Sequence, residues 1–284
     1  MSDEALEVEA VGPEAERDVD ARFERRVMMN VPSRRNARLR KVIELVNADE
    51  ELYGLWIAAN VNAVERLHMS DHGPVHVKIV MNMAVRMLRL LLEAGVEAGV
   101  VANYEMEGAD AEVVVALAAL LHDVGMSIHR ADHEAYSLFV AQSKLDDILP
   151  EVYGPRHRTI IRAEVLHAII SHRSGGRPLT LEAGVVRIAD ALDMAKGRSR
   201  IPFAAGSLSI HAVSAAAVES VAIDPGEGRP IRVTITLSNS AGLFQLDQLL
   251  RNKLEGSGLE GHLEIQAKLG DGDQEKRLLT DFRL

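Results

Sequence analysis

The segment from Ala111 to His122 constrains the fold of this chain most, because it is apolar on nearly every side. A helix with one apolar stripe can lie on a protein surface, whereas a helix that is apolar all round has to be buried. We therefore expect this segment to form the central helix of a helical bundle.

The residues around this segment also have the spacing of helices. Between Leu39 and Val46, apolar residues recur at steps of three and four, which places them on one helix face. Gly95, Gly99 and Gly108 predict a loop before the central helix. Further helices are predicted over Tyr53–Leu67, Val75–Glu93, His133–Leu145, Pro155–Ile170 and Leu181–Ala195. Residues 33–203 are thus predicted to form one all-helical domain.

After Pro202 the pattern changes to that of strands. Apolar and polar residues alternate over Ile231–Leu237, and a proline- and glycine-rich loop separates this segment from Val221–Asp224. A helix is predicted over Leu243–Leu254, and two more strands over His262–Leu269 and Arg277–Leu284. The fold class is therefore mainly α, a helical bundle with a small C-terminal α+β domain of order ββαββ over residues 204–284. Residues 1–32 are predicted to be a mobile acidic tail.

Composition narrows the range of partners. The chain has 32 basic and 42 acidic residues, a net charge of -10, and one tryptophan, four tyrosines and five phenylalanines. This argues against a nucleic-acid polymer as partner, which would need basic and aromatic surface. The longest apolar run, Val113–Leu121, is far shorter than the roughly 20 residues that cross a bilayer. Because the first residues also lack the pattern of a secretory signal, we expect a cytoplasmic protein without a membrane partner.

A group of polar residues in apolar surroundings predicts a metal site. The chain has no cysteine, which leaves histidine, carboxylate and water as metal ligands. His122 and Asp123 end the apolar central helix, where their desolvation is costly unless a cation compensates. His76 opens a helix after Gly73-Pro74, and Asp190 interrupts an apolar helical stretch. Two imidazoles with two carboxylates suit Mn²⁺, Fe²⁺, Co²⁺, Ni²⁺ or Zn²⁺ better than Ca²⁺.

These motifs and their order resemble the HD superfamily of metal-dependent phosphohydrolases, which is named after its adjacent His-Asp pair. The match falls on His76 in HGPVHVKIV, on His122 and Asp123 in LLHDVG, and on Asp190 in RIADALD, across roughly residues 65–195. The resemblance implies a helical core that holds one or two divalent ions, with Mg²⁺ as a further candidate. A water molecule activated by such ions can attack phosphorus, so no side-chain nucleophile is required.

The resemblance also implies where a second ion would bind. Superfamily members with two metals add two histidines between the His-Asp pair and the last Asp, and His133 and His172 look like those ligands, with Asp123 as the bridge. His129 and His167 remain alternatives for these two positions. A single ion with outer histidines also remains open.

Several basic residues are candidates for binding the phosphate of a substrate. Asp123 and Arg173 are predicted to be catalytic, and Asp193 can orient a ligand from one helical turn beyond Asp190. Many relatives read His-Asp-x-Gly-Lys, where the lysine helps to hold phosphate, but this chain has Met126 at the position of that lysine, which weakens the case for a generic phosphomonoesterase. The candidate phosphate-binding residues are Lys78, Arg130, Arg173, Lys196, Arg198 and Arg200.

The leading prediction is a metal-dependent phosphohydrolase that acts on a nucleotide or another small phosphate ester. One alternative is a di-iron oxygenase of the HD type, similar to inositol oxygenase; another is a non-catalytic regulator that binds a nucleotide. The C-terminal domain carries no motif, so we expect it to serve in dimerisation, giving a homo-oligomer, or in ligand sensing. Because Asp190 precedes this domain, we expect metal binding to survive its removal.

Overall fold

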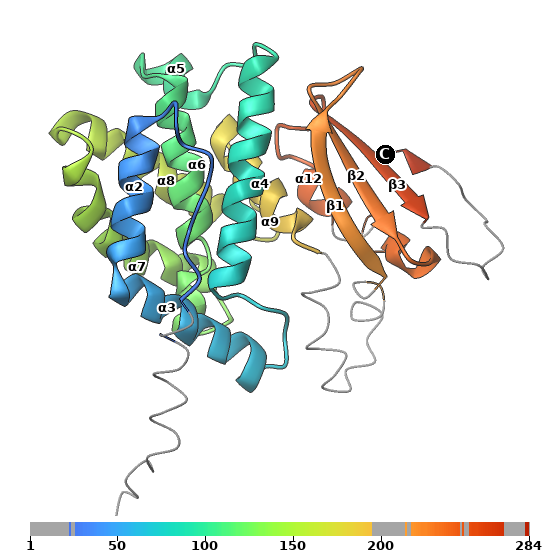
Figure 1. Cartoon of the computed structure of the whole chain (residues 1–284), viewed down its shortest axis with the longest axis horizontal. Helices are drawn as coiled ribbons and strands as arrows, with labels where there is room; N and C mark the ends of the chain where they lie inside the picture. The colour runs from blue at the N-terminus through green and yellow to red at the C-terminus, as the bar shows by residue number, and fades with distance from the viewer. Residues whose placement is uncertain are drawn as a thin grey trace, which may run out of the picture.

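The two parts of the chain that the sequence predicts are both present in the structure, a computed structural model. It describes residues 23, 26–194, 214, 217–244, 246 and 250–269, and the backbone of residues 282–283. Figure 1 shows the helical bundle on one side and the β-sheet on the other. The predicted fold class, a helical domain with a small C-terminal α+β unit, is confirmed.

The central helix is α6, which covers Gly108–Leu121 and whose residues from Val113 onward are completely buried. It begins at a capping box formed by Glu107 and Asp110. The helices packed around it are α2 (Ala37–Ala48), α4 (Pro74–Glu93), α8 (Pro155–Ser171) and α9 (Leu181–Leu192). The expectation of a buried central helix is therefore correct, and His122 follows its last turn.

The remaining helices complete the bundle. They are α3 (Glu50–Asn60), which continues as a π-helix over Val61–Arg66, α5 (Gly99–Tyr104), α7 (His133–Ile148), and 3₁₀ turns at Val124–Ser127 and Leu149–Glu151. Helix α5 lies where the sequence predicted only a loop. Its first turn is stabilised by the buried carboxylate of Glu182, which accepts hydrogen bonds from the backbone N–H groups of Gly99 and Val100 at 2.9 and 3.0 Å.

The C-terminal sheet has four strands in the order β1-β2-β3-β4. They cover β1 (Val218–Pro225), β2 (Ile231–Leu237), β3 (Leu263–Leu269) and β4 (Phe282–Arg283). The pair β1–β2 is antiparallel, β2–β3 is parallel and β3–β4 is antiparallel. A parallel pair needs a crossover connection, and the described part of this crossover includes a 3₁₀ turn at Ser240–Gly242 and the short helix α12 (Arg251–Leu254). This is the predicted ββαββ order.

The sheet and its crossover pack directly on the bundle. Helix α4 contacts β1 and β2, and helix α9 contacts α12 (Figure 1). At Gly184 in α9, an added Cβ atom would lie 2.3 Å from the carbonyl oxygen of Ser257, so this glycine permits a close approach of the two backbones. The C-terminal unit therefore touches the helix that carries Asp190.

The last residues of the predicted acidic tail are packed against the bundle. Met29 is buried, and its backbone exchanges two hydrogen bonds of 2.8 Å with the side chain of Asn47. The packed chain thus starts before residue 33, while the boundaries of the predicted domains stay predictions. None of the described helices is long and apolar enough to cross a membrane.

Candidate metal centre

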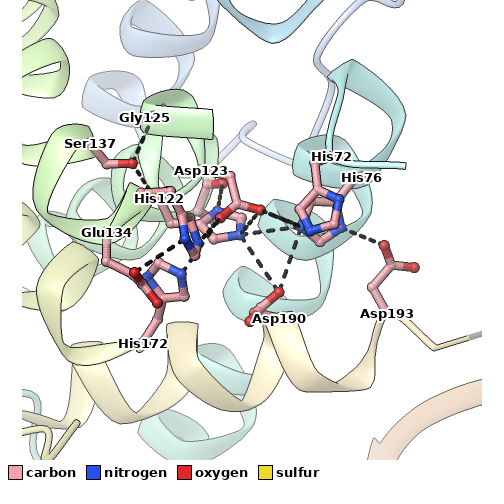
Figure 2. A network of polar contacts seen from close by, with 12 residues as sticks. His72, His76, His122, Asp123, Gly125, Glu134, Ser137, His172, Asp190 and Asp193 are labelled. Carbon is pink, nitrogen blue, oxygen red and sulfur yellow. Dashed lines mark hydrogen bonds and ion pairs between the residues drawn. The ribbon is translucent and has the colours of Figure 1, made fainter. Parts of the chain in front are cut away.

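Four of the predicted ligands meet at one point inside the bundle (Figure 2). His76 lies in the first turn of α4, His122 and Asp123 follow α6, and Asp190 lies in α9. The Nε2 atoms of His76 and His122 are 3.2 Å apart and lie 3.4 and 3.2 Å from Asp123 Oδ2. Both also lie 3.6 Å from Asp190 Oδ1. We call these four donors the first donor group.

The spacing of this group fits a divalent ion. Ligand atoms bound at about 2.1 Å in tetrahedral or octahedral geometry lie roughly 3.0 to 3.4 Å from their neighbours, and the observed separations are 3.2 to 3.6 Å. The donors are two nitrogens and two oxygens, a set that transition metals accept readily. The residues present can therefore hold such an ion.

A second set of donors lies on the other side of Asp123. Asp123 Oδ1 is 3.1 Å from His133 Nε2 and 3.6 Å from His172 Nε2. We call these three donors the second donor group. Since Asp123 directs one carboxylate oxygen to each group, it has the position of a bridging ligand between two ions.

The two alternative histidines face elsewhere. His129 is exposed, and its Nδ1 accepts a hydrogen bond from the backbone N–H of Ala131. His167 accepts one from the backbone N–H of Leu179. Of the competing candidates, the structure thus brings His133 and His172 to Asp123, not His129 and His167.

All four histidine rings have a hydrogen-bond acceptor at Nδ1 and direct Nε2 at the centre; for His133 the acceptor is the Arg130 carbonyl at 3.1 Å. The Nδ1 atom of His76 is 2.6 Å from Asp193 Oδ2, that of His122 is 2.8 Å from the Ala119 carbonyl, and that of His172 is 2.6 Å from the Ile169 carbonyl. An acceptor at Nδ1 fixes the proton there and leaves Nε2 to bind a metal. Asp193 thus orients His76, as its position one turn after Asp190 indicated.

The buried carboxylates of the centre bring negative charge into the bundle, and positively charged groups of the protein lie beside them. Burial alone would raise the pKa of Asp123, but His122 and the hydrogen bonds of His133 and His172 hold it well below its ordinary value. Burial would also raise the pKa of Asp190, but Lys253 and His122 hold it well below its ordinary value. Burial would lower the pKa of His122, yet Asp123 and Asp190 raise it to about 10. In the metal-free protein, a proton on His122 thus supplies positive charge that an ion would otherwise supply.

The glycine of the His-Asp motif is required by packing. A Cβ atom on Gly125 would lie 2.1 Å from the carbonyl oxygen of His133 and 2.4 Å from the backbone nitrogen of Ser137. Gly125 donates its N–H to Ser137 Oγ at 2.9 Å, and this hydroxyl donates to the His122 carbonyl at 2.6 Å (Figure 2). The absence of a side chain therefore lets α7 bring His133 next to Asp123.

Met126 lies next to this turn and is completely buried in a small apolar cluster with Ala59 and Ala63. Its backbone carbonyl accepts a hydrogen bond of 2.7 Å from Asn62 in the π-helix. The residue directly after the His-Asp-x-Gly motif therefore belongs to the core in this chain.

The predicted phosphate-binding residues differ in their exposure to solvent and in their contacts with the donor groups. Lys78 is half-buried and makes no described contact with the donor groups, since residues two apart on a helix face different directions. Arg173 is exposed directly after His172. Arg130 Nη1 is 2.8 Å from His133 Nδ1. Lys196, Arg198 and Arg200 lie outside the described residues.

Two residues near the centre were not singled out from the sequence. Lys253 in α12 places its Nζ 3.4 Å from Asp190 Oδ2 and also donates to the carbonyl oxygen of His172. Arg187 in α9 is buried and donates to the carbonyl oxygens of Ser171 and Arg173, on either side of His172. Lys253 lies in no sequence motif, and Arg187 begins the RIADALD segment that was noted for Asp190 alone, so only the tertiary structure reveals the contacts of these two residues.

Comparison with known proteins agrees with this geometry. The family model of the HD domain matches residues 76–195, which span the donors from His76 to Asp190. The chain therefore belongs to the HD-domain family, and the family membership predicted from the motifs is confirmed. Members of this family are typically metal-dependent phosphohydrolases.

Two curated relatives differ in how much of their length is matched. The chain is 41% identical to the uncharacterized protein MJ1020 of Methanocaldococcus jannaschii over 226 residues, 80% of this chain and 86% of that protein. It is 29% identical to ribonuclease Y of Thermoanaerobacter pseudethanolicus over 170 residues, 58% of this chain but only 30% of that protein. No solved structure matches the chain.

Proposed function

We propose that this protein is a metal-dependent phosphohydrolase that acts on a nucleotide or another small phosphate ester. The observation that carries the proposal is the pair of donor groups that share Asp123, each with spacings suited to a divalent ion. Ions held there would activate water and neutralise charge on a phosphate. Membership of the HD-domain family supports the same class of reaction.

The side chains of the centre have distinct proposed roles. Asp123 holds both ions and is the residue on which the reaction depends most. Asp193 orients His76 through the hydrogen bond at Nδ1. Arg173 is exposed beside His172, where its guanidinium can bind a phosphate oxygen. We keep Lys196, Arg198 and Arg200 as proposed phosphate contacts because they follow Asp190 closely in the sequence.

The size of the substrate is a separate question. The net charge of -10 disfavours a long polyanion, since polymer binding gains its affinity from many basic contacts. Ribonuclease Y, however, is by its name an enzyme that acts on RNA, and it is similar over part of this chain. An RNA oligomer therefore belongs among the substrates to be tested.

The test is a substrate screen with defined metals. The protein is stripped of metal and reloaded with Mn²⁺, Fe²⁺, Co²⁺, Ni²⁺, Zn²⁺ or Mg²⁺, and phosphate release from nucleotides and phosphate monoesters is measured beside cleavage of a short RNA. We expect metal-dependent hydrolysis of a small ester, lost in Asp123→Ala and retained in Asp224→Ala, a control at an exposed strand residue.

Three results would contradict the proposal in different ways. Cleavage of RNA alone would assign a polymer substrate. Oxygen consumption by the iron-loaded protein without phosphate release would favour the oxygenase. Tight metal binding without turnover of any ester would favour the regulator.

A further inference from the structure

The C-terminal unit places a positive charge at the edge of the metal centre. Lys253 comes from the crossover between β2 and β3, far along the chain from the other residues of the centre. We propose that Lys253 is a substrate-binding residue, which holds the phosphate group of the substrate beside the metal centre. This inference rests on the proposed phosphohydrolase function and adds the C-terminal unit to its active site.

The position of Lys253 follows from the two oxygens of Asp190. Oδ1 faces His76 and His122 at 3.6 Å, whereas Oδ2 faces the ammonium group of Lys253 at 3.4 Å. Lys253 thus stands directly outside the first donor group. Among the described residues, it is the one lysine or arginine that forms an ion pair with an aspartate of this group.

Asp190 is also the most exposed of the six predicted ligands. The side chains of His76, His122 and Asp123 are at most 4% exposed, but those of Asp190 and Lys253 are 16% and 23% exposed. Within the first donor group, solvent therefore reaches Asp190 most readily, and Lys253 lies beside it.

The ammonium group has the capacity to bind a further acceptor. It carries three N–H donors, and among the described residues the His172 carbonyl and Asp190 Oδ2 take two of them. A phosphate oxygen is a strong acceptor for the third, because both partners are charged.

Arg187 holds Lys253 firmly in place. Its Nε donates to the Lys253 carbonyl at 2.7 Å and its Nη2 to the Asn252 carbonyl at 3.2 Å. The same guanidinium donates through Nη1 to the carbonyls on both sides of His172, at 3.2 and 2.6 Å. One buried side chain therefore ties the backbone of Lys253 to that of a predicted ligand, and we assign Arg187 as a positioning residue.

The competing explanation is that Lys253 merely links the C-terminal unit to the bundle. A linking residue would affect the unfolding temperature and leave phosphate binding unchanged. A substrate-binding residue would affect phosphate affinity and KM while the bound metal stays the same. The two explanations therefore differ in quantities that can be measured separately.

The experiment uses the full chain loaded with Mn²⁺ and inorganic phosphate as the probe. Lys253→Gln removes the charge but retains an N–H group for the His172 carbonyl, and Lys253→Arg retains the charge. Arg251→Met, at an exposed position of the same helix, is the matched control. Calorimetry gives the phosphate Kd, elemental analysis the bound metal, and scanning calorimetry the unfolding temperature.

We expect Lys253→Gln to weaken phosphate binding about tenfold or more and to raise KM, with unchanged metal content. Lys253→Arg should recover part of the affinity, and Arg251→Met should match the wild type. Wild-type phosphate affinity in Lys253→Gln, with or without a lower unfolding temperature, would overturn the role of Lys253 alone. Failure of the loaded wild-type protein to bind phosphate or hydrolyse any ester would instead overturn the proposed function.

Discussion

The two donor groups of the metal centre differ in how completely the protein fills them. The first group has four donors, and its histidine rings are fixed at Nδ1 by Asp193 and the Ala119 carbonyl. The second has three donors, and its histidine rings likewise have an acceptor at Nδ1, the Arg130 carbonyl at 3.1 Å for His133 and the Ile169 carbonyl at 2.6 Å for His172. A metal with four protein ligands is held tightly, whereas one with three keeps a position for water or substrate.

This difference indicates a division of roles. The first group is expected to bind its ion tightly and to keep it during turnover. The second is expected to bind more weakly and to exchange its ion more readily, because it relies on Asp123 and two histidines.

The largest effect is expected for Asp123→Ala, because Asp123 supplies an oxygen to both groups. Both ions should be lost, and hydrolysis should fall at least about a thousandfold, since metal activation contributes several kcal/mol to the rate. Elemental analysis and the phosphate-release assay measure the two effects. Full metal content and rate in this variant would show that the assigned centre is wrong.

The two groups should separate in single substitutions. His133→Ala and His172→Ala each leave the first group intact, so the metal content should fall toward one ion per chain. His76→Ala disrupts the first group and should remove the tightly bound ion. Equilibrium dialysis against Mn²⁺ followed by elemental analysis gives the content of each variant. Equal losses in all three would contradict the difference between the groups.

Metal affinity should rise with pH because an ion has to displace a proton from His122. The pKa of His122 in the metal-free protein is raised from 6.5 to about 10, so the ring is protonated at neutral pH. If one proton is lost on binding, the metal affinity increases about tenfold for each unit by which the pH is raised, up to about pH 10. Titrations with Mn²⁺ at pH 6, 7 and 8 should show this slope. An affinity independent of pH would mean that no proton is displaced.

The smallest effect is expected for Asp193→Asn, which keeps the size of the side chain but removes its negative charge. Asp193 contacts His76 Nδ1 and not the donor side of the ring, so the ion should still bind, about tenfold more weakly. The Kd of the tighter ion measures this. An unchanged Kd would show that Asp193 does not tune the first group.

The first donor group could be predicted from the sequence because its residues interrupt apolar helices in a recognisable order. His133 was predicted from the family resemblance, but the spacing of the residues left His129 open, because the position of His133 depends on the close approach of α7 at Gly125. Lys78 was predicted to bind phosphate because it is close to His76 in sequence. Residues two apart on a helix point in different directions, so this closeness does not bring Lys78 to the donor groups.

Features created by contacts between distant segments gave no sequence signal. Helix α5 depends on Glu182, whose carboxylate binds the first N–H groups of that helix. Lys253 stands in a helix of four residues, and its place at the centre is fixed by the packing of α12 on α9 and by Arg187. The C-terminal unit therefore contacts the metal centre at this point, and the survival of metal binding after its removal stays a prediction.

The most direct test of the centre is a metal titration of the unmodified, metal-free protein. We expect two Mn²⁺ ions per chain with clearly different affinities, because one group has four protein donors and the other three. The electron paramagnetic resonance spectrum of the fully loaded protein should show coupling between the ions through Asp123. A chain that binds one ion at saturation, or two that do not interact, would contradict the shared centre.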